Sequence, residues 1–189
     1  MPNPMNTFDV IIAGAGPAGS SAAIHLARKD FRVLLVEQKK FPRPKLCGEF
    51  ISPECRRHFE ALGVAQAMTD SDPASITETV FYSARGHHVT IPSSWFGGPA
   101  ALGLSRAVMD DVLLKRARSC GVEVIEGATI TEPILDNNIV RGVKLKINGD
   151  EPQHHTAPLT IDATGRARIL TRKLRAGEPK SQRPQNDQN

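Results

Sequence analysis

Hydrophobic positions near the start of the chain form two short continuous runs, separated by a glycine-rich break and a helix-forming stretch. Residues 9–13 and 31–37 are typical of buried strands, because neither run alternates with polar positions. Glycines at 14–19 end the first run, and residues 17–29 have the composition of a helix. A strand, turn, helix and strand in this order predict a right-handed parallel crossover.

Alternation between apolar and polar positions predicts two antiparallel excursions from this sheet. Residues 76–82 and 87–91 alternate on either side of Arg85-Gly86, which predicts a β-hairpin outside the parallel sheet. Residues 129–147 form a second alternating stretch that turns at Asn137-Asn138. The other expected elements are helices over 54–63 and 105–120, the latter with Val108, Val112 and Ala117 on one side, a strand over 122–126, a buried strand over 159–162, and a turn at Asn148-Gly149.

These elements predict an α/β fold of the Rossmann-like kind, with a parallel sheet, an antiparallel meander as a crossover, and an extra hairpin at about residues 76–91. We expect one domain over residues 1–174. Residues 175–189 are expected to form a disordered polar tail, because only glycine, two prolines and polar residues follow Ala176.

Composition narrows the classes of function. The net charge of +4 comes from scattered Lys and Arg, and only 5% of residues are aromatic, so no nucleic-acid partner is expected. Three cysteines and six histidines lack the spacing of a metal site, and the histidines are expected to be solvated. The first residues do not resemble a signal peptide, and no apolar run reaches the roughly 18 residues of a membrane span. We expect a cytoplasmic protein, and nothing in the sequence supports membrane contact.

The glycine-rich break has the spacing of a dinucleotide-binding fingerprint. Gly14, Gly16 and Gly19 give the pattern GxGxxG, with Pro17 and Ala18 between the last two. Such glycines permit a tight turn, a close approach of the backbone to a diphosphate, and packing of the helix on the strand. The diphosphate would lie at the helix N-terminus, where backbone N–H groups and the helix dipole stabilise negative charge.

Glu37 ends the second strand, where a ribose acceptor is expected. A carboxylate at this position accepts hydrogen bonds from the 2′- and 3′-hydroxyls of an adenosine ribose and repels a 2′-phosphate. The pattern therefore favours FAD or NAD over NADP. A glycine-rich loop in an α/β domain that binds no nucleotide is the structural alternative.

Residues 9–37, followed by FPRPKLCGEFISP at 41–53, resemble the geranylgeranyl reductase family of FAD-dependent oxidoreductases, within the flavoprotein monooxygenase and halogenase group. The resemblance covers about residues 8–172. Its most specific part is the segment Lys45-x-Cys47-Gly48, which separates the chain from generic dinucleotide-binding proteins. The resemblance implies FAD as the cofactor.

The resemblance also implies further cofactor-binding residues. Lys45, Cys47 and Gly48 would contact FAD; the alternative for Cys47 is a small buried side chain. Arg106, before the long helix, would reach the pyrophosphate or ribityl region; the alternative is an exposed arginine in a first helical turn. Ile130 would meet the adenine through its backbone.

Asp162 and Gly165 end the last predicted strand and resemble the Asp-Gly type of segment that closes the nucleotide site in this group. Turn chemistry alone would also place an acid and a glycine there. Both interpretations stay open at this point.

The activity implied by the resemblance is hydride transfer from flavin to an isoprenoid or other apolar substrate, or oxygen activation as in the related monooxygenases, with NAD(P)H or another electron donor. Residues beyond Arg172 turn polar, and the later Gly-Asp segment of the family is not found, so we expect a chain truncated before the second half of the family fold. No catalytic residue is identified. The alternatives are a noncatalytic nucleotide-binding fragment and an NAD-dependent dehydrogenase.

Overall fold

The computed structural model describes residues 6–47, 49–147 and 150–176, and it divides the chain into two compact units. The first unit comprises Met1–Lys40 and Ala117–Asn189, and the second comprises Phe41–Arg116. Gly48, the predicted turn at 148–149 and the predicted tail beyond Ala176 lie outside the described residues.

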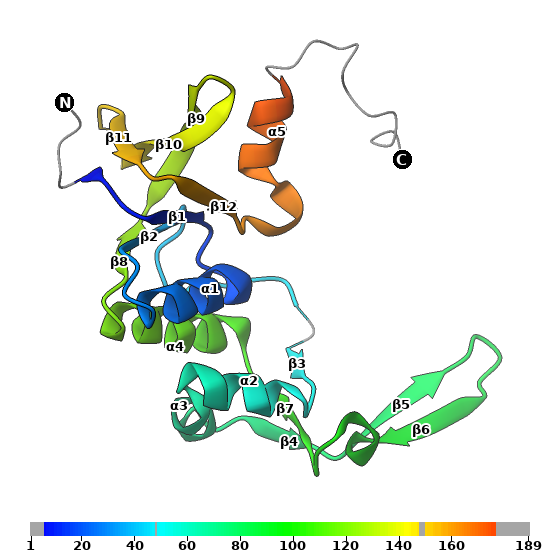
Figure 1. Ribbon diagram of the computed structural model, residues 1–189. Coiled ribbons are helices and arrows are strands. Elements are labelled where there is room, and N and C mark those ends of the chain that lie inside the picture. Colours follow the sequence, from blue (N-terminus) through cyan, green and yellow to red (C-terminus); the bar gives the residue numbers. More distant parts are fainter. Residues whose placement is uncertain (1–5, 48, 148–149, 177–189) are drawn as a thin grey trace. The chain divides into compact units, whose positions relative to one another are not determined.

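A four-stranded parallel sheet forms the centre of the first unit (Figure 1). Its strand order is β12-β1-β2-β8, so the first two strands of the chain lie side by side in the middle. The continuous apolar runs predicted this position, because central strands are covered on both faces. The elements are β1 (Val10–Ala13), α1 (Pro17–Ala27), β2 (Val33–Glu37), β8 (Glu123–Glu126) and β12 (Leu159–Asp162).

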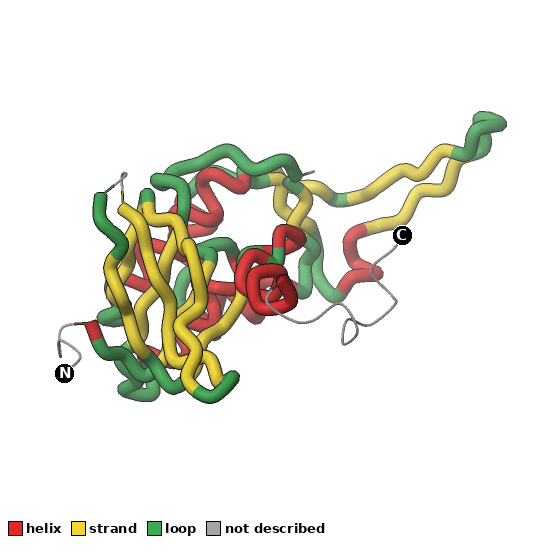
Figure 2. The backbone as a smooth tube through the Cα atoms, turned by 90° about the horizontal axis from the view of Figure 1, so that it is seen from above, coloured by secondary structure: helices red, strands yellow, loops and turns green. Residues whose placement is uncertain are grey.

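An antiparallel sheet covers one face of the parallel sheet, and α1 covers the other (Figure 1). Its strands are β9 (Ala128–Asp136), β10 (Ile139–Ile147) and β11 (Gln153–Thr156), and they stack over the parallel strands in the view of Figure 2. Asn137 and Asn138 have φ angles of 48° and 64°, which confirms the predicted turn. The core between the two sheets contains Phe8, Ile11, Ala13, Leu34, Val36, Ala128, Ile130, Val143, Leu145, Ala157 and Leu170.

A short 3-10 turn and a last helix complete the first unit. The turn η3 (Gly165–Ala167) follows β12, and α5 (Ile169–Ala176) then packs against β9 and β12. Leu170 is the residue through which α5 joins the core between the sheets. The helix extends through Ala176, two residues into the stretch that was expected to be a tail.

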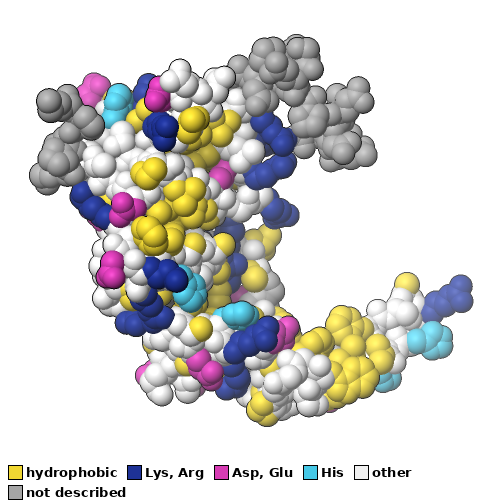
Figure 3. Space-filling model, in the orientation of Figure 1, with side chains coloured by type: hydrophobic (Ala, Val, Ile, Leu, Met, Phe, Trp, Pro, Cys, Tyr) yellow, Lys and Arg dark blue, Asp and Glu magenta, His cyan; other side chains and the backbone are white. Residues whose placement is uncertain are grey.

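The second unit contains two small antiparallel sheets and several helices. One sheet has the order β3-β7-β4, and the other consists of β5 and β6 alone, which confirms the predicted hairpin outside the parallel sheet. Hydrophobic side chains gather over this hairpin in Figure 3, among them the exposed Phe81 and Tyr82. The elements are β3 (Phe50–Ile51), α2 (Cys55–Leu62), α3 (Ala65–Asp70), β4 (Ala74–Ile76), β5 (Glu78–Tyr82), β6 (His88–Pro92), η2 (Ser93–Phe96), β7 (Ala101–Gly103) and most of α4 (Arg106–Ser119), whose last three residues belong to the first unit.

Three local predictions were wrong. Val108 is 38% exposed and Val112 is only partly buried, whereas Ala117 is buried. Met109, Leu113 and Leu114 complete the buried face of α4 at helical spacing. Strand β12 is not fully buried, because it lies at the sheet edge and leaves Leu159 exposed. His155 was expected to be solvated, yet it is 3% exposed because β11 turns this side chain inward, beside Phe8.

Among the described residues, no helix combines the length and the hydrophobicity needed to cross a bilayer.

Candidate functional site

The glycine turn is held tightly between β1 and its neighbouring strands. The N–H of Gly14 donates to the carbonyl oxygen of Val36 at 2.7 Å, and the N–H of Ala163 donates to that of Ala13 at 2.8 Å. Gly14 has a φ of 99°, and a Cβ atom at this position would lie 2.6 Å from the carbonyl oxygen of Ala163. Both the conformation and the lack of space therefore require glycine.

The N-terminus of α1 has the features of an anion-binding site. Gly16 occupies the N-cap position, Pro17 opens the first turn, and no side chain of the described residues caps this end. A Cβ atom on Gly19 would overlap the carbonyl oxygen of Gly14, so the helix packs directly on the turn. Ala18 lies in the same first turn, which contains no acidic residue. The first N–H groups of a helix are not bonded within it, and they attract a phosphate group.

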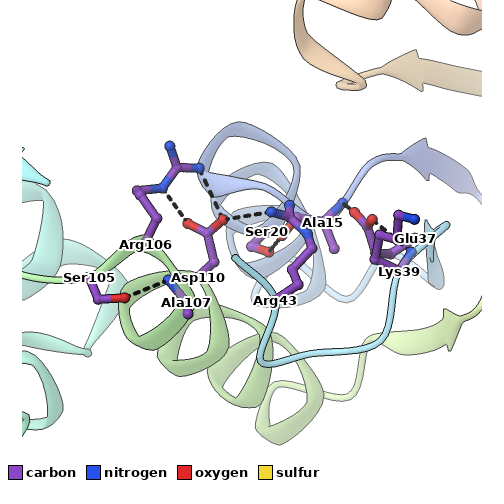
Figure 4. A network of polar contacts seen from close by, with 9 residues as sticks. All are labelled: Ala15, Ser20, Glu37, Lys39, Arg43, Ser105, Arg106, Ala107 and Asp110. Atoms are coloured by element: carbon purple, nitrogen blue, oxygen red, sulfur yellow. Dashed lines mark hydrogen bonds and ion pairs between the residues drawn. The ribbon is translucent and has the colours of Figure 1, made fainter. Parts of the chain in front are cut away.

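Glu37 links the end of β2 to the glycine turn. Its Oε2 accepts a hydrogen bond of 2.9 Å from the N–H of Ala15, and its Oε1 accepts one of 3.0 Å from the N–H of Lys39 (Figure 4). The residue is only 8% exposed. Ser20, which is fully buried, also donates to the carbonyl oxygen of Ala15 at 3.1 Å. The acidic residue predicted at this strand end is therefore fixed beside the turn.

Asp162 organises the end of β12. Its Oδ1 accepts hydrogen bonds from the N–H and the hydroxyl of Thr164, and its Oδ2 accepts two from the same groups of Thr171. Burial raises the pKa of Asp162, but the four hydrogen bonds outweigh this effect and leave the pKa below its usual value. Gly165 follows in a left-handed conformation with a φ of 71°. The carboxylate therefore stabilises the segment that lies against Gly14.

In the second unit, Arg106 begins α4 and forms a two-pronged ion pair. Its Nε and Nη2 donate to the two carboxylate oxygens of Asp110 at 2.9 and 3.0 Å (Figure 4). The hydrogen bond with Asp110 is the main reason that the pKa of Arg106 is raised; a hydrogen bond with Cys47 acts in the same direction. The Arg106 side chain is 18% exposed, which argues against a freely solvated arginine.

The remaining residues predicted to contact the cofactor differ in their exposure. Lys45 and Cys47 are exposed in the loop before β3, so the interpretation of Cys47 as a small buried side chain was wrong. Cys47 and Arg106 are brought together by their hydrogen bond. Ile130 lies in β9, is 7% exposed and belongs to the core between the two sheets. Gly48 lies outside the described residues.

Two residues of these networks escaped the sequence analysis. Asp110 is four positions after Arg106, and this spacing places both side chains on one helix face. The spacing was a usable signal, although the sequence does not show which of Asp110 and Asp111 is buried. Thr171 is nine positions from its partner Asp162, and no local pattern indicates that contact.

In this parallel sheet, β1 leads through a glycine turn into the uncapped N-terminus of α1, and β2 ends in an acidic residue. These features define a dinucleotide-binding α/β protein. The sequence matches the FAD dependent oxidoreductase family over residues 9–177. The chain therefore belongs to this family, whose cofactor is FAD, and the resemblance inferred from the sequence is confirmed.

The relatives include enzymes that are named after lipid substrates. The digeranylgeranylglycerophospholipid reductase of Sulfolobus acidocaldarius is 29% identical over 170 residues, which cover 88% of this chain and 36% of the reductase. The protein of the same name from Methanosarcina mazei is 30% identical over 159 residues, which cover 84% of this chain and 38% of that protein. The chain spans less than two fifths of the length of either relative.

Solved structures give the same fold. The myxobacterial chondrochloren halogenase CndH, an FAD-dependent halogenase, superimposes with a TM-score of 0.81 and 25% identity, over 89% of this chain and 39% of the halogenase. A geranylgeranyl bacteriochlorophyll reductase-like protein from Thermoplasma acidophilum has a TM-score of 0.77 and 25% identity, over 92% of this chain and 42% of that protein. The predicted fold class, an FAD-binding Rossmann-like domain, is thus confirmed.

Proposed function

We propose that this chain binds FAD through the ADP half of the cofactor, as the nucleotide-binding part of a flavin-dependent oxidoreductase. The observation that carries the proposal is the 2.9 Å hydrogen bond from the N–H of Ala15 to Glu37, because it joins the diphosphate turn to the ribose acceptor. The residues present fit the ADP part of FAD. Gly14 and Gly19 have no room for a Cβ atom in the turn, and no side chain of the described residues caps the N-terminus of α1 beside it.

Each residue of the turn has a role in this proposal. Gly14 and Gly19 bring turn, strand and helix together, while Gly16, Pro17 and Ala18 present the helix N-terminus to the diphosphate. The carboxylate of Glu37 accepts hydrogen bonds from the ribose hydroxyls. The same negative charge repels a 2′-phosphate, so NADP is excluded from this position.

Further FAD contacts are proposed on the family resemblance. They comprise Lys45, Cys47, Gly48, Arg106, Ile130, Asp162 and Gly165. Arg106 suits a phosphate oxygen because its planar guanidinium carries several donors in a fixed geometry. Asp162 acts through the backbone that it orders, since both of its oxygens are bonded to Thr164 and Thr171.

When bound, FAD supplies hydride transfer to a substrate or the activation of oxygen. The residues of this chain bind the cofactor and orient it. On the names of the relatives we propose an isoprenoid or other apolar substrate, with NAD(P)H or another electron donor. The second candidate is a noncatalytic FAD-binding protein, since no catalytic residue is identified among the proposed contacts.

The test is a set of binding titrations on the 189-residue chain with FAD, ADP, NAD and FMN. FAD and ADP should bind, whereas FMN, which lacks the ADP half, should not. An equal affinity for FMN and FAD would contradict the assignment of the turn to ADP, and binding of NAD in place of FAD would favour the dehydrogenase. Turnover of NAD(P)H by the FAD-loaded protein separates an active enzyme from a noncatalytic FAD-binding protein.

A further inference from the structure

Asp110 is a buried carboxylate that serves two arginines. Its side chain has no exposed surface, and both of its oxygens accept hydrogen bonds from Arg106. Its Oδ2 also lies 3.5 Å from Nη1 of Arg43, whose side chain is 12% exposed (Figure 4). A buried carboxylate is costly without partners, so the two guanidinium groups are what make this position tolerable. The cluster carries one net positive charge.

The pairing restricts how Arg106 can present its remaining donors. A guanidinium has five N–H groups, and the bonds to Asp110 use one on Nε and one on Nη2. The guanidinium also forms a hydrogen bond with Cys47. Its other donors, on Nη1 and Nη2, point away from the carboxylate in directions set by the two-pronged geometry. Arg43 is similarly confined, with its guanidinium 4.6 Å from the centre of the Phe41 ring.

We propose that Asp110 is a positioning residue for FAD binding, which fixes the guanidinium of Arg106 so that its remaining donors are ready for a phosphate oxygen. This inference rests on the proposed function, and Asp110 itself does not contact the cofactor. The advantage is entropic: an arginine that is already ordered loses less conformational freedom on binding than a solvated one.

The experiment is a double-mutant cycle on the full chain, read as the dissociation constant for FAD. Asp110→Asn keeps the size of the side chain but removes the charge and one acceptor, and should weaken FAD binding about tenfold. In the Arg106→Ala background, the same substitution should change the affinity less than about twofold, because the group it positions is absent. Asp111→Asn is the matched control, since Asp111 also pairs four positions along the helix but with the exposed Lys115. It should leave the affinity unchanged.

An equal loss in both backgrounds would overturn the proposal, because Asp110 would then act independently of Arg106. If Asp110→Asn does not fold by circular dichroism, Arg106→Lys decides: it keeps the charge but not the two-pronged pair, and should lose as much affinity as Arg106→Ala. Parental affinity in Arg106→Lys would overturn the inference. Absence of FAD binding by the parent chain would overturn the proposed function, and this inference with it; unchanged binding by Asp110→Asn would overturn the inference alone.

Discussion

The N–H of Ala15 and the carboxylate of Glu37 are joined by a 2.9 Å hydrogen bond across 22 positions of the sequence. This bond ties the glycine turn after β1 to the last residue of β2. Because the same carboxylate also accepts the N–H of Lys39, it orders the backbone just after β2 as well as the glycine turn. One side chain is thus expected to contribute both to the stability of the turn and to the recognition of adenosine.

Substitution of Glu37 by Gln should therefore affect folding and binding together. The amide nitrogen cannot accept, so one of the two backbone N–H groups loses its partner, at a cost of about 1–3 kcal/mol in the free energy of unfolding. ADP should bind about tenfold more weakly. Urea unfolding and an ADP titration give the two values. The control is Glu123→Gln, whose half-exposed carboxylate lies 3.8 Å from Arg32 and should cost less than about 1 kcal/mol. Equal effects of the two substitutions would refute the special role of Glu37.

Gly14→Ala should destabilise the chain more than Gly121→Ala. Both glycines have positive φ angles, 99° and 88°, so both substitutions carry a conformational cost of about 1–2 kcal/mol. Only at Gly14 would the new Cβ meet the backbone of Ala163, whereas nothing lies within 4 Å of it at Gly121. We expect Gly14→Ala to cost about 1–3 kcal/mol more. Thermal or urea unfolding measures the difference, and equal losses would mean that the turn is not tightly packed.

His155 should make the chain less stable in mild acid. Burial lowers the pKa of this imidazole, and the neighbouring His154 acts in the same direction, while Glu123 opposes it. Its two ring nitrogens have no hydrogen-bond partner among the described residues. Below about pH 6.5 the unfolded chain takes up a proton here that the folded chain does not. The free energy of unfolding is thus at its full value above about pH 6.5, as far as His155 determines it, and it declines as the pH falls toward the lowered pKa of the folded state.

Replacement of His155 by Phe removes this proton-linked loss and retains an aromatic ring beside Phe8. The decrease in the free energy of unfolding between pH 7.5 and pH 5.5 should be smaller in this variant than in the parent chain. The control is His154→Gln at the exposed neighbouring position, which should retain most of the parental decrease. An unchanged decrease in His155→Phe would show that other groups cause it.

Asp162→Asn should loosen the segment from β12 to α5. Asparagine keeps only one of the two side-chain oxygens, so the pair of hydrogen bonds from either Thr164 or Thr171 is lost. We expect the free energy of unfolding to fall by about 1–3 kcal/mol. The pKa of Asp162 is lowered in the folded state. The contribution of its carboxylate to the free energy of unfolding is therefore fully present above the ordinary pKa near 3.9, and it is lost as the pH falls through the folded-state pKa. The variant should therefore lose less stability on acidification. Unfolding curves at pH 7 and pH 3.5 test both points, with the exposed Asp136→Asn as the control.

The strongest sequence patterns gave elements close to those observed. The runs at 9–13 and 31–37 correspond to β1 and β2, because continuous burial and flanking glycines leave few alternatives. The hairpin of β5 and β6 was also predicted, since alternation and a glycine turn are local signals. The short elements α3 and β4 were missed, because three to six residues contain too little periodicity to distinguish a strand from a helix.

Part of the candidate site was predictable, because backbone geometry restricts which residues can occupy it. Gly14 and Glu37 follow from turn geometry and from the position of a strand end, and both lie where the fingerprint implies. Asp110 and His155 depend on which face of an element is buried, which is decided by packing against segments distant in sequence. The same dependence on packing explains why Val108 was expected on one side of the helix with Ala117, although only Ala117 is buried.

The absorbance spectrum of the purified protein, after incubation with FAD and desalting, decides whether this chain itself forms an FAD site. We expect flavin bands that remain with the protein and disappear in Glu37→Gln or Gly14→Ala. A chain that is folded by circular dichroism but retains no flavin, at protein concentrations well above micromolar, would contradict this expectation.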